Sequence, residues 1–196
     1  TLLAGGLAGQ LAVSVRNPEL ASGLAARGVD VRQGDFDAPG SLGRAFAHIR
    51  AVLGPITTIV HGAGYERSRA FTAKSNDELT QTVATKVEGA LNAIALSRSD
   101  ELAHFVSFTS VSGRFGGLGQ ADYALANELL VRVTGALAAE RPAVRAIAID
   151  WSAWGEVGMA MRKDTRQHLE RRGRTFMSVA EGCRHLLREL GASTRE

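Results

Sequence analysis

Four residues in the second half of the chain have the types and the spacing needed for acid–base chemistry. Tyr123 and Asn127 lie four residues apart in "GQADYALAN", so a helix would place both side chains on one face. Ser110 ends a buried run, "FVSFTS", ahead of Tyr123. A tyrosine that donates a proton near neutral pH needs a cation beside it, because its unperturbed pKa is about 10. No lysine or arginine lies within one helical turn of Tyr123.

The missing cation is predicted to come from a helix expected at residues 76–97. A capping box, "SNDE", begins this helix at 75–78. Its apolar stripe contains Leu79, Val83, Ala90 and Ile94. Steps of four and three residues place Lys86 on the same stripe, where a lysine is costly unless it is paired or functional. We therefore expect Lys86 to reach an internal site; the alternative is that its long side chain extends to solvent from the edge of the stripe.

Small residues at the ends of the first strands are typical of nucleotide-binding folds. "LLAGGLAG" carries Gly5, Gly6 and Gly9, which would let backbone N–H groups approach a pyrophosphate, and a plain turn is the alternative. Arg16 in "SVRNPE" follows the next strand, where NAD-binding folds usually place an acid for the ribose hydroxyls. An arginine there favours a 2′-phosphate, and a solvated arginine before a turn is the alternative.

Two further stretches are candidate cofactor contacts. In "GDFD" at 34–37, Asp35 is a candidate contact for the adenine of the cofactor, and a helix cap is the alternative interpretation of this residue. Phe36 is a further candidate cofactor contact. In "VHGAG" at 60–64 a small-residue turn would let the backbone pass close to a cofactor, and we interpret His61 as structural. The small residues of this turn are Gly62, Ala63 and Gly64.

An alternation of strands and helices must position these residues. Strands are expected at 2–4, 11–15, 29–32, 57–60, 105–108 and 144–149, and helices near 18–27, 39–53, 76–97, 121–139 and 178–190. This pattern predicts an α/β fold, a Rossmann-like doubly wound parallel sheet with helices on both faces. Such sheets bind ligands at the carboxyl ends of their strands, where Lys86, Ser110 and Tyr123 would converge.

One junction does not fit this alternation. Only four residues separate Gly6 from Leu11, whereas neighbouring parallel strands need a crossover of a dozen or more. We expect a helix to be missing around Gly9–Gln10; a degenerate domain that lacks it is the alternative. Residues 1–196 are interpreted as one domain, the catalytic half of something larger.

Composition excludes several other classes of protein. The chain has 196 residues, a formal net charge of +3 and a pI near 9.5, but its basic residues are scattered apart from "ERRGR" and no nucleic-acid surface is indicated. No apolar run reaches the roughly 18 residues of a membrane span. The single cysteine, Cys183, and the lack of a Cys/His cluster predict no disulfide and no metal site. We expect a reducing, cytoplasmic compartment.

These motifs resemble the ketoreductase domain of polyketide and polyunsaturated-fatty-acid synthases, a branch of the short-chain dehydrogenase/reductase superfamily. The resemblance rests on "VHGAG", "TKVEGA", "FTSVSG…GQADYALAN" and "DWSAWGEVGMA", within residues 57–161. Most short-chain reductases carry Tyr-x-x-x-Lys, whereas this branch has Tyr-x-x-x-Asn and takes its lysine from the preceding helix. The matching positions are Lys86, Ser110, Tyr123 and Asn127.

The resemblance implies an enzyme that uses NADPH to reduce a β-ketoacyl thioester on an acyl carrier protein to the β-hydroxyacyl thioester, beside other synthase domains. It implies that Tyr123 is the acid and that Ser110 hydrogen-bonds the same substrate oxygen. Lys86 would lower the pKa of Tyr123 and contact the nicotinamide ribose, and Asn127 would hold a water or the lysine. The alternatives are a freestanding reductase of a small carbonyl compound and a silent nucleotide-binding scaffold.

The chain departs from the family pattern in several places. Its first glycine motif is partial, the amino-terminal structural half is absent, and "YERSR" after "HGAG" lacks a Leu-Asp-Asp motif. Phe115 stands where one stereochemical class tends to have tryptophan, so the stereochemistry of the product stays open.

Residues 152–176 lack a simple period and suit a lid over the substrate. Within this lid Trp154 and Met159 are candidate substrate contacts, with packing beneath a loop as the alternative.

Overall fold

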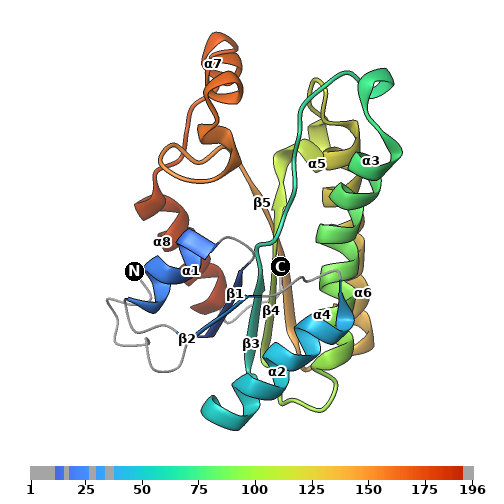
Figure 1. Cartoon of the computed structure of the whole chain (residues 1–196), viewed down its shortest axis with the longest axis vertical. Coiled ribbons are helices and arrows are strands. Elements are labelled where there is room, and N and C mark those ends of the chain that lie inside the picture. Colours follow the sequence, from blue (N-terminus) through green and yellow to red (C-terminus); the bar gives the residue numbers. More distant parts are fainter. Residues whose placement is uncertain (1–11, 16–17, 27–29, 34–37, 192–196) are drawn as a thin grey trace.

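Parallel strands form the centre of the fold (Figure 1). The computed structural model describes residues 12–15, 18–26, 30–33 and 38–191. β1 (Ala12–Val15) pairs with β2 (Asp30–Gln33), and a second sheet has the order β3 (Thr58–His61), β4 (His104–Ser110), β5 (Arg145–Trp151). Every pairing among these strands is parallel, which confirms the predicted α/β class. The strand expected at 2–4 and the junction at Gly9–Gln10 lie outside the described residues.

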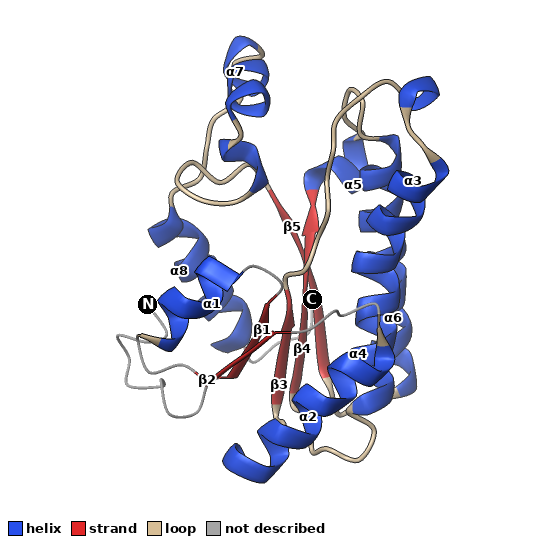
Figure 2. Cartoon of the chain, viewed as in Figure 1, coloured by secondary structure: helices blue, strands red, loops and turns tan. Residues whose placement is uncertain are grey.

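Helices lie on both sides of the strands (Figure 2). The long elements are α1 (Pro18–Ala25), α2 (Pro39–Leu53), α3 (Asn76–Val83), α4 (Gly89–Leu96), α6 (Ala121–Glu140) and α8 (Val179–Gly191). Their positions agree with the sequence periodicity. The segment η3 (Ala84–Glu88) lies within the helix expected at 76–97, but its π-helical form was not predicted. The elements that were not predicted at all are η2 (Phe71–Ala73), α5 (Val111–Phe115), η4 (Met159–Met161) and α7 (Lys163–Arg171).

The apolar core lies between β4 and the helices α2, α4 and α6. Phe105 of β4 is fully buried, and Leu130 of α6 is buried beside it in the same cluster. The remaining core side chains are Leu42, Phe46, Ile56, Ala90, Ala93, Leu102, Leu137 and Val144. Burying side chains of this size stabilises a fold by about 1.5–3 kcal/mol each, so the core fixes α6 against the sheet.

The carboxyl ends of the strands meet at one edge. In the parallel register Ser110, the last residue of β4, pairs with Trp151, the last residue of β5, and β3 ends at His61, opposite Ser107 of β4. The loops that begin after these three residues therefore start from the same edge of the sheet. Ligands of open α/β folds bind outside this edge.

The base of the 152–176 segment is anchored to α8 through Trp154. Trp154 forms a bridge with Met177, and its ring packs edge-on against Trp151, with centroids 5.1 Å apart. On the other side the ring lies on Gly182 of α8, where an added Cβ would stand 2.1 Å from a ring carbon. The Trp154 ring thus occupies the space where a side chain at position 182 would lie, so any residue larger than glycine there would displace the ring.

Gly182→Ala is expected to destabilise the protein by about 1–3 kcal/mol, because the new methyl group overlaps the Trp154 ring. Urea unfolding followed by tryptophan fluorescence measures this. Gly135→Ala is the matched control, because Gly135 lies inside α6 with nothing within 4 Å of its Cβ position and should stabilise by about 0.5–1 kcal/mol. Equal changes in the free energy of unfolding for the two variants would contradict the packing of Trp154 on Gly182.

Candidate active site

Lys86 lies inside the protein, as its place on the apolar stripe predicted. It belongs to η3, a π-helical turn between α3 and α4, and is 3% exposed. Its Nζ donates a hydrogen bond to the backbone oxygen of Phe108 in β4 at 2.8 Å and stands 5.8 Å from the ring centroid of Tyr123. Single π turns are rare and occur frequently at functional sites. The cation sought for Tyr123 is therefore next to it, supplied by a different helix.

Burial changes the acidity of both groups. Desolvation lowers the pKa of Lys86 to about 8. Burial also raises the pKa of Tyr123, and the nearby Glu66 carboxylate adds to the rise. Hydrogen bonds from the side chains of Asn127 and Ser110 to the phenol lower this pKa and oppose the effect of burial. Tyr123 is therefore held in its protonated form, as a proton donor must be before it reacts.

Ser110 and Asn127 are oriented by the backbone around them. The Oγ of Ser110 accepts the N–H of Ser112 at 3.2 Å and so caps α5, which leaves its own hydrogen available to Tyr123. Asn127 is fully buried, and its Nδ2 donates to the backbone oxygen of Tyr123 at 2.7 Å. Its Oδ1 has no hydrogen-bond partner among the residues that the structure describes. That oxygen is a ready acceptor for a water at the site.

The "HGAG" turn contacts Lys86 at two points. The Nε2 of His61 lies 2.9 Å from the backbone oxygen of Lys86, and because a carbonyl only accepts, the imidazole donates. Burial lowers the pKa of His61 to about 4, which keeps the ring neutral. A Cβ added to Gly64 would lie 3.5 Å from the Nζ of Lys86. His61 is thus structural, as interpreted from the sequence, and the structure it supports is the lysine turn.

The three candidate substrate contacts have different surroundings. Met159, in η4, brings its Cε to 3.6 Å from the Cβ position of Gly64, beside Lys86. Phe115, at the end of α5, is 85% exposed. Trp154 packs against Gly182 of α8 and against Trp151. Met159 is therefore the member of this set that the structure brings to the lysine, while all three remain predictions as substrate contacts.

The cofactor candidates from the first part of the chain are not placed. The residues that lie outside the described part are Gly5, Gly6, Gly9, Arg16, Asp35 and Phe36. Gly62 lies against Phe108, with its Cβ position 3.7 Å from the ring. Ala63 lies between Gly62 and Gly64 in the same turn.

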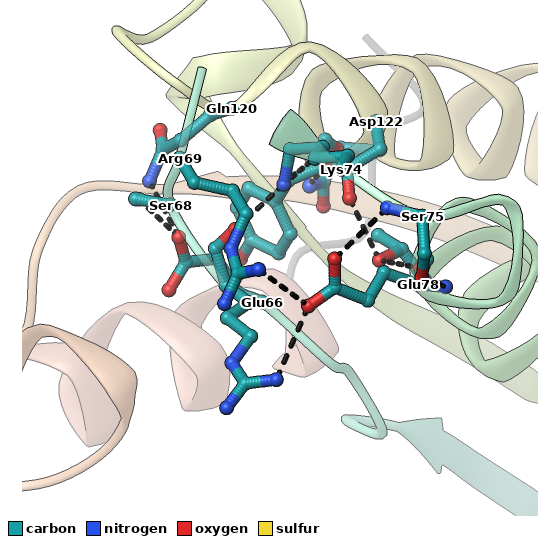
Figure 3. Close-up of polar contacts among 12 residues, drawn as sticks. Glu66, Ser68, Arg69, Lys74, Ser75, Glu78, Gln120 and Asp122 are labelled. Carbon is teal, nitrogen blue, oxygen red and sulfur yellow. Dashed lines mark hydrogen bonds and ion pairs between the residues drawn. The ribbon is translucent and has the colours of Figure 1, made fainter. Parts of the chain in front are cut away.

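Sequence reasoning missed a buried ion pair next to Tyr123 (Figure 3). The Nζ of Lys74 stands 2.9 Å from Oδ1 of Asp122, and the two side chains are 1% and 2% exposed. Thr82 donates to the other carboxylate oxygen at 2.9 Å, and Lys74 also donates to the backbone oxygen of Arg67 at 2.6 Å. The pair fixes the loop before α3 to the first turn of α6. The sequence feature that could have indicated this ion pair is Asp122, an acidic residue directly before the candidate tyrosine.

Neither a membrane span nor a metal cluster occurs within the described ranges. No helix there is long and apolar enough to cross a bilayer. No group of three or more His, Cys, Asp or Glu side chains in the same ranges is arranged to hold a metal ion.

A parallel α/β fold with a serine at a strand end, a tyrosine in the long helix that follows and a buried lysine beside it defines a short-chain dehydrogenase/reductase. The KR domain family matches residues 3–156, and the chain belongs to this family, the ketoreductase domains of polyketide synthases. The match covers every residue of the lysine, serine and tyrosine set. It ends within the 152–176 segment.

Curated relatives are large synthases. The chain is 30% identical over 170 residues to polyketide synthase PksN of Bacillus subtilis (strain 168), covering 82% of this chain and 3% of PksN. It is 33% identical over 142 residues to the mycoketide-CoA synthase of Mycobacterium tuberculosis, covering 70% of this chain and 3% of that protein. A polyunsaturated fatty acid synthase polypeptide of Thraustochytrium sp. is 35% identical over 100 residues, which cover 50% of this chain and 4% of that protein. The chain therefore spans a small part of the curated relatives that it matches.

Solved ketoreductases share the fold. PlmKR1, from the first module of phoslactomycin biosynthesis in Streptomyces sp. HK803, superposes with a TM-score of 0.83 at 27% identity, over 99% of this chain and 46% of that one. A ketoreductase domain from the bacillaene assembly line gives 0.78 at 26% identity, over 96% of this chain and 50% of that one. The chain thus spans about half the length of these structures.

Proposed function

We propose that this chain is the catalytic part of a ketoreductase that uses NADPH to reduce a β-ketoacyl thioester, presented on an acyl carrier protein, to the β-hydroxyacyl thioester. The observation that carries the proposal is the buried Lys86 ammonium 5.8 Å from the ring centroid of Tyr123, with Ser110 among the side chains that lower the pKa of the phenol. A buried charge is costly, so its retention beside a proton donor is typical of a catalytic site.

The chain's own residues perform the proton delivery. The phenol of Tyr123 donates its proton to the ketone oxygen, and Ser110 hydrogen-bonds that oxygen while negative charge develops on it. The ammonium of Lys86 favours the phenolate that remains, because an opposite charge stabilises the ionised form. The free Oδ1 of Asn127 accepts a hydrogen bond from a water that returns a proton toward the site. NADPH, when bound, supplies the hydride.

The residues at the site fit a nicotinamide cofactor. The backbone of Gly64 passes close to the Lys86 ammonium, with the Cβ position of the glycine 3.5 Å from Nζ, so a ribose hydroxyl held along this turn would lie near that donor. We propose that Lys86, Tyr123 and the backbone of Gly62–Gly64 hold the nicotinamide end. Arg16 is proposed to bind the 2′-phosphate, with the glycines at 5, 6 and 9 at the pyrophosphate and Asp35 and Phe36 at the adenine. A short-chain dehydrogenase from Burkholderia cenocepacia J2315 with this fold was solved in complex with NADP.

The direct test uses the full polypeptide that carries this chain. We expect it to reduce a β-ketoacyl chain on its carrier protein faster than the free β-ketoester, and with NADPH in preference to NADH. Mass spectrometry of the carrier detects the gain of two hydrogens. Equal rates on the free ketone favour a freestanding reductase, and NADPH binding without reduction of either substrate favours a silent scaffold. Equal use of both cofactors contradicts the assignment of Arg16.

A further inference from the structure

The "YERSR" stretch, which departs from the family pattern, places a buried acid beside the site. Glu66 is 4% exposed, and a buried carboxylate is destabilising unless it is hydrogen-bonded or paired. Its Oε1 accepts hydrogen bonds from the hydroxyl of Ser68 and, at 3.4 Å, from Nε2 of Gln120 (Figure 3). Its Oε2 stands 3.5 Å from Nη1 of Arg162, which also donates to the Glu66 backbone oxygen. We refer to Glu66, Ser68, Gln120 and Arg162 as the Glu66 network.

The network reaches both elements that carry the catalytic candidates. Gln120 directly precedes α6, three residues before Tyr123, and its Oε1 accepts a hydrogen bond from Ser112 at 3.0 Å. Ser112 lies two residues after Ser110 and donates its N–H to it. The backbone N–H of Arg69 donates to the oxygen of Gly119 at 3.1 Å, so the two loops are also joined directly. Glu66 is therefore bonded to the segment that runs from Ser110 to Tyr123.

The third arm of the network is the lid. Arg162 closes η4, the turn that brings Met159 to Gly64 and Lys86. In the same segment Arg166 bonds Glu170 at 2.8 Å and the oxygen of Gly155 at 3.5 Å, so it holds the lid together internally. Arg162 instead reaches across to the loop after β3. Among the lid contacts described, two polar contacts from Arg162 to Glu66 join η4 to the loop beside Tyr123: the ion pair with the carboxylate and the hydrogen bond to the backbone oxygen.

We propose that Glu66 is a positioning residue for the reduction: its buried carboxylate binds Arg162 and so holds the lid over the serine–tyrosine–lysine site. This rests on the proposed function. Closure of the lid and proton donation by Tyr123 are then linked, because the same Glu66 carboxylate pairs with Arg162 of the lid and raises the pKa of Tyr123.

The charges around Tyr123 determine the sign of this link. Lys86 faces the ring of Tyr123 from η3, the Glu66 carboxylate acts on the phenol from the loop after β3, and Arg162 forms an ion pair with Glu66 from the lid. Asp122, the neighbour of Tyr123 in α6, is paired with Lys74. The Glu66 carboxylate raises the pKa of Tyr123, so neutralising it lowers that pKa. Removing Arg162 leaves the carboxylate less compensated and raises the pKa further.

The experiment compares Glu66→Gln, Arg162→Met and the double variant in the full polypeptide, with Arg67→Met as the matched control. Arg67 belongs to the same loop but pairs with Glu78, away from the lid. Both single variants are expected to raise KM for the carrier-bound substrate by up to about fivefold, the usual range for an ion pair with a half-exposed partner, because each removes the ion pair between Arg162 and the Glu66 carboxylate. Glu66→Gln keeps the hydrogen bond from Arg162 to the backbone oxygen of residue 66, so its effect should be the smaller of the two. The pH at which kcat falls on the alkaline side follows the pKa of Tyr123. It is expected to be lower than in the wild type for Glu66→Gln and higher for Arg162→Met. The double variant follows Glu66→Gln, because Arg162 acts through Glu66.

Hydrogen exchange gives a readout that does not depend on activity. The amides of Met161, Arg162 and Arg166 are bonded within the lid and are expected to exchange faster in both single variants, but not in Arg67→Met. Unchanged lid exchange, or alkaline pH limits of kcat that do not move in opposite directions, would overturn the proposal. If the wild-type polypeptide reduces no substrate, the proposed function fails, and lid exchange alone still decides whether Glu66 holds the lid.

Discussion

Tyr123→Phe is expected to lower kcat by about 10²–10⁴-fold, the usual contribution of a positioned general acid. The substitution removes only the hydroxyl, so the ring that packs near Lys86 and the helix α6 stay in place. Single-turnover reduction of the carrier-bound substrate measures the loss at the chemical step. A matching change in KM is not expected, because the hydroxyl acts when charge develops on the substrate oxygen.

Tyr65→Phe is the matched control for this variant. Tyr65 is the other tyrosine of the chain and follows the "HGAG" turn directly, so the substitution removes the same atom near the same site. Its kcat should stay close to the wild-type value. If Tyr123→Phe also kept near-full activity, the proton would have to come from another group, and the proposed mechanism would be wrong.

Lys86→Met is expected to depress reduction by about 10²-fold while leaving the fold intact or more stable. The loss follows because the methionine cannot stabilise the phenolate of Tyr123, so the apparent pKa of the acid rises. The Lys86→Met/Tyr123→Phe double variant should be no slower than Tyr123→Phe, since the lysine acts through the tyrosine. If the two losses multiplied, or if the pH profile of Lys86→Met were that of the wild type, the lysine would act independently of the phenol.

The stability of Lys86→Met should depend on pH in a defined direction. Burial lowers the pKa of Lys86 from 10.5 to about 8, so the folded state binds the proton less tightly than the unfolded state. The cost of the buried ammonium, on the order of 3 kcal/mol, is present below pH 8 and disappears as the pH rises toward 10.5. Loss of the bond to Phe108 offsets about 1–2 kcal/mol of the gain. The gain in unfolding free energy is therefore largest below pH 8.

Lys74→Met provides the contrast for that measurement. Lys74 is as buried as Lys86 but is paired with Asp122, so its removal leaves an uncompensated carboxylate in the interior. Losses of about 3–5 kcal/mol are typical of such a change. The two lysine-to-methionine variants should thus shift the urea midpoint in opposite directions. A shift in the same direction would show that Lys86 also has a structural role.

Much of the arrangement could be predicted from residue types and periods. The step pattern from Leu79 through Lys86 predicted a buried lysine, and Lys86 is 3% exposed. The "SNDE" capping box is present, with Ser75 and Glu78 bonded to each other's backbone. The strand that ends at Ser110 and the helix that carries Tyr123 both occur where the β-branched run and the apolar period placed them. These features are local, so a short window of sequence contains the information.

Other features depend on contacts between distant residues, and no local pattern indicates them. The π turn at Lys86 is accompanied by a bond from His61, 25 residues earlier. The position of Trp154 depends on the missing side chain of Gly182. The surroundings of Glu66 come from Gln120 and Arg162, which approach only after the sheet has brought three loops to one edge.

The sequence by itself indicated the fold class through periodicity and residue type, which are properties of the chain alone. Its motifs also carried the resemblance to the ketoreductase family, from which Lys86, Ser110, Tyr123 and Asn127 are predicted as the catalytic set. Only the tertiary structure decided which charges meet. Burial sets the pKa of Lys86 at about 8 and raises that of Tyr123, and the same folding brings Arg162 to Glu66. Desolvation and Coulomb energy depend on distance and on the exclusion of water, and both exist only once α6, η3 and the lid have packed around the carboxyl edge of the sheet.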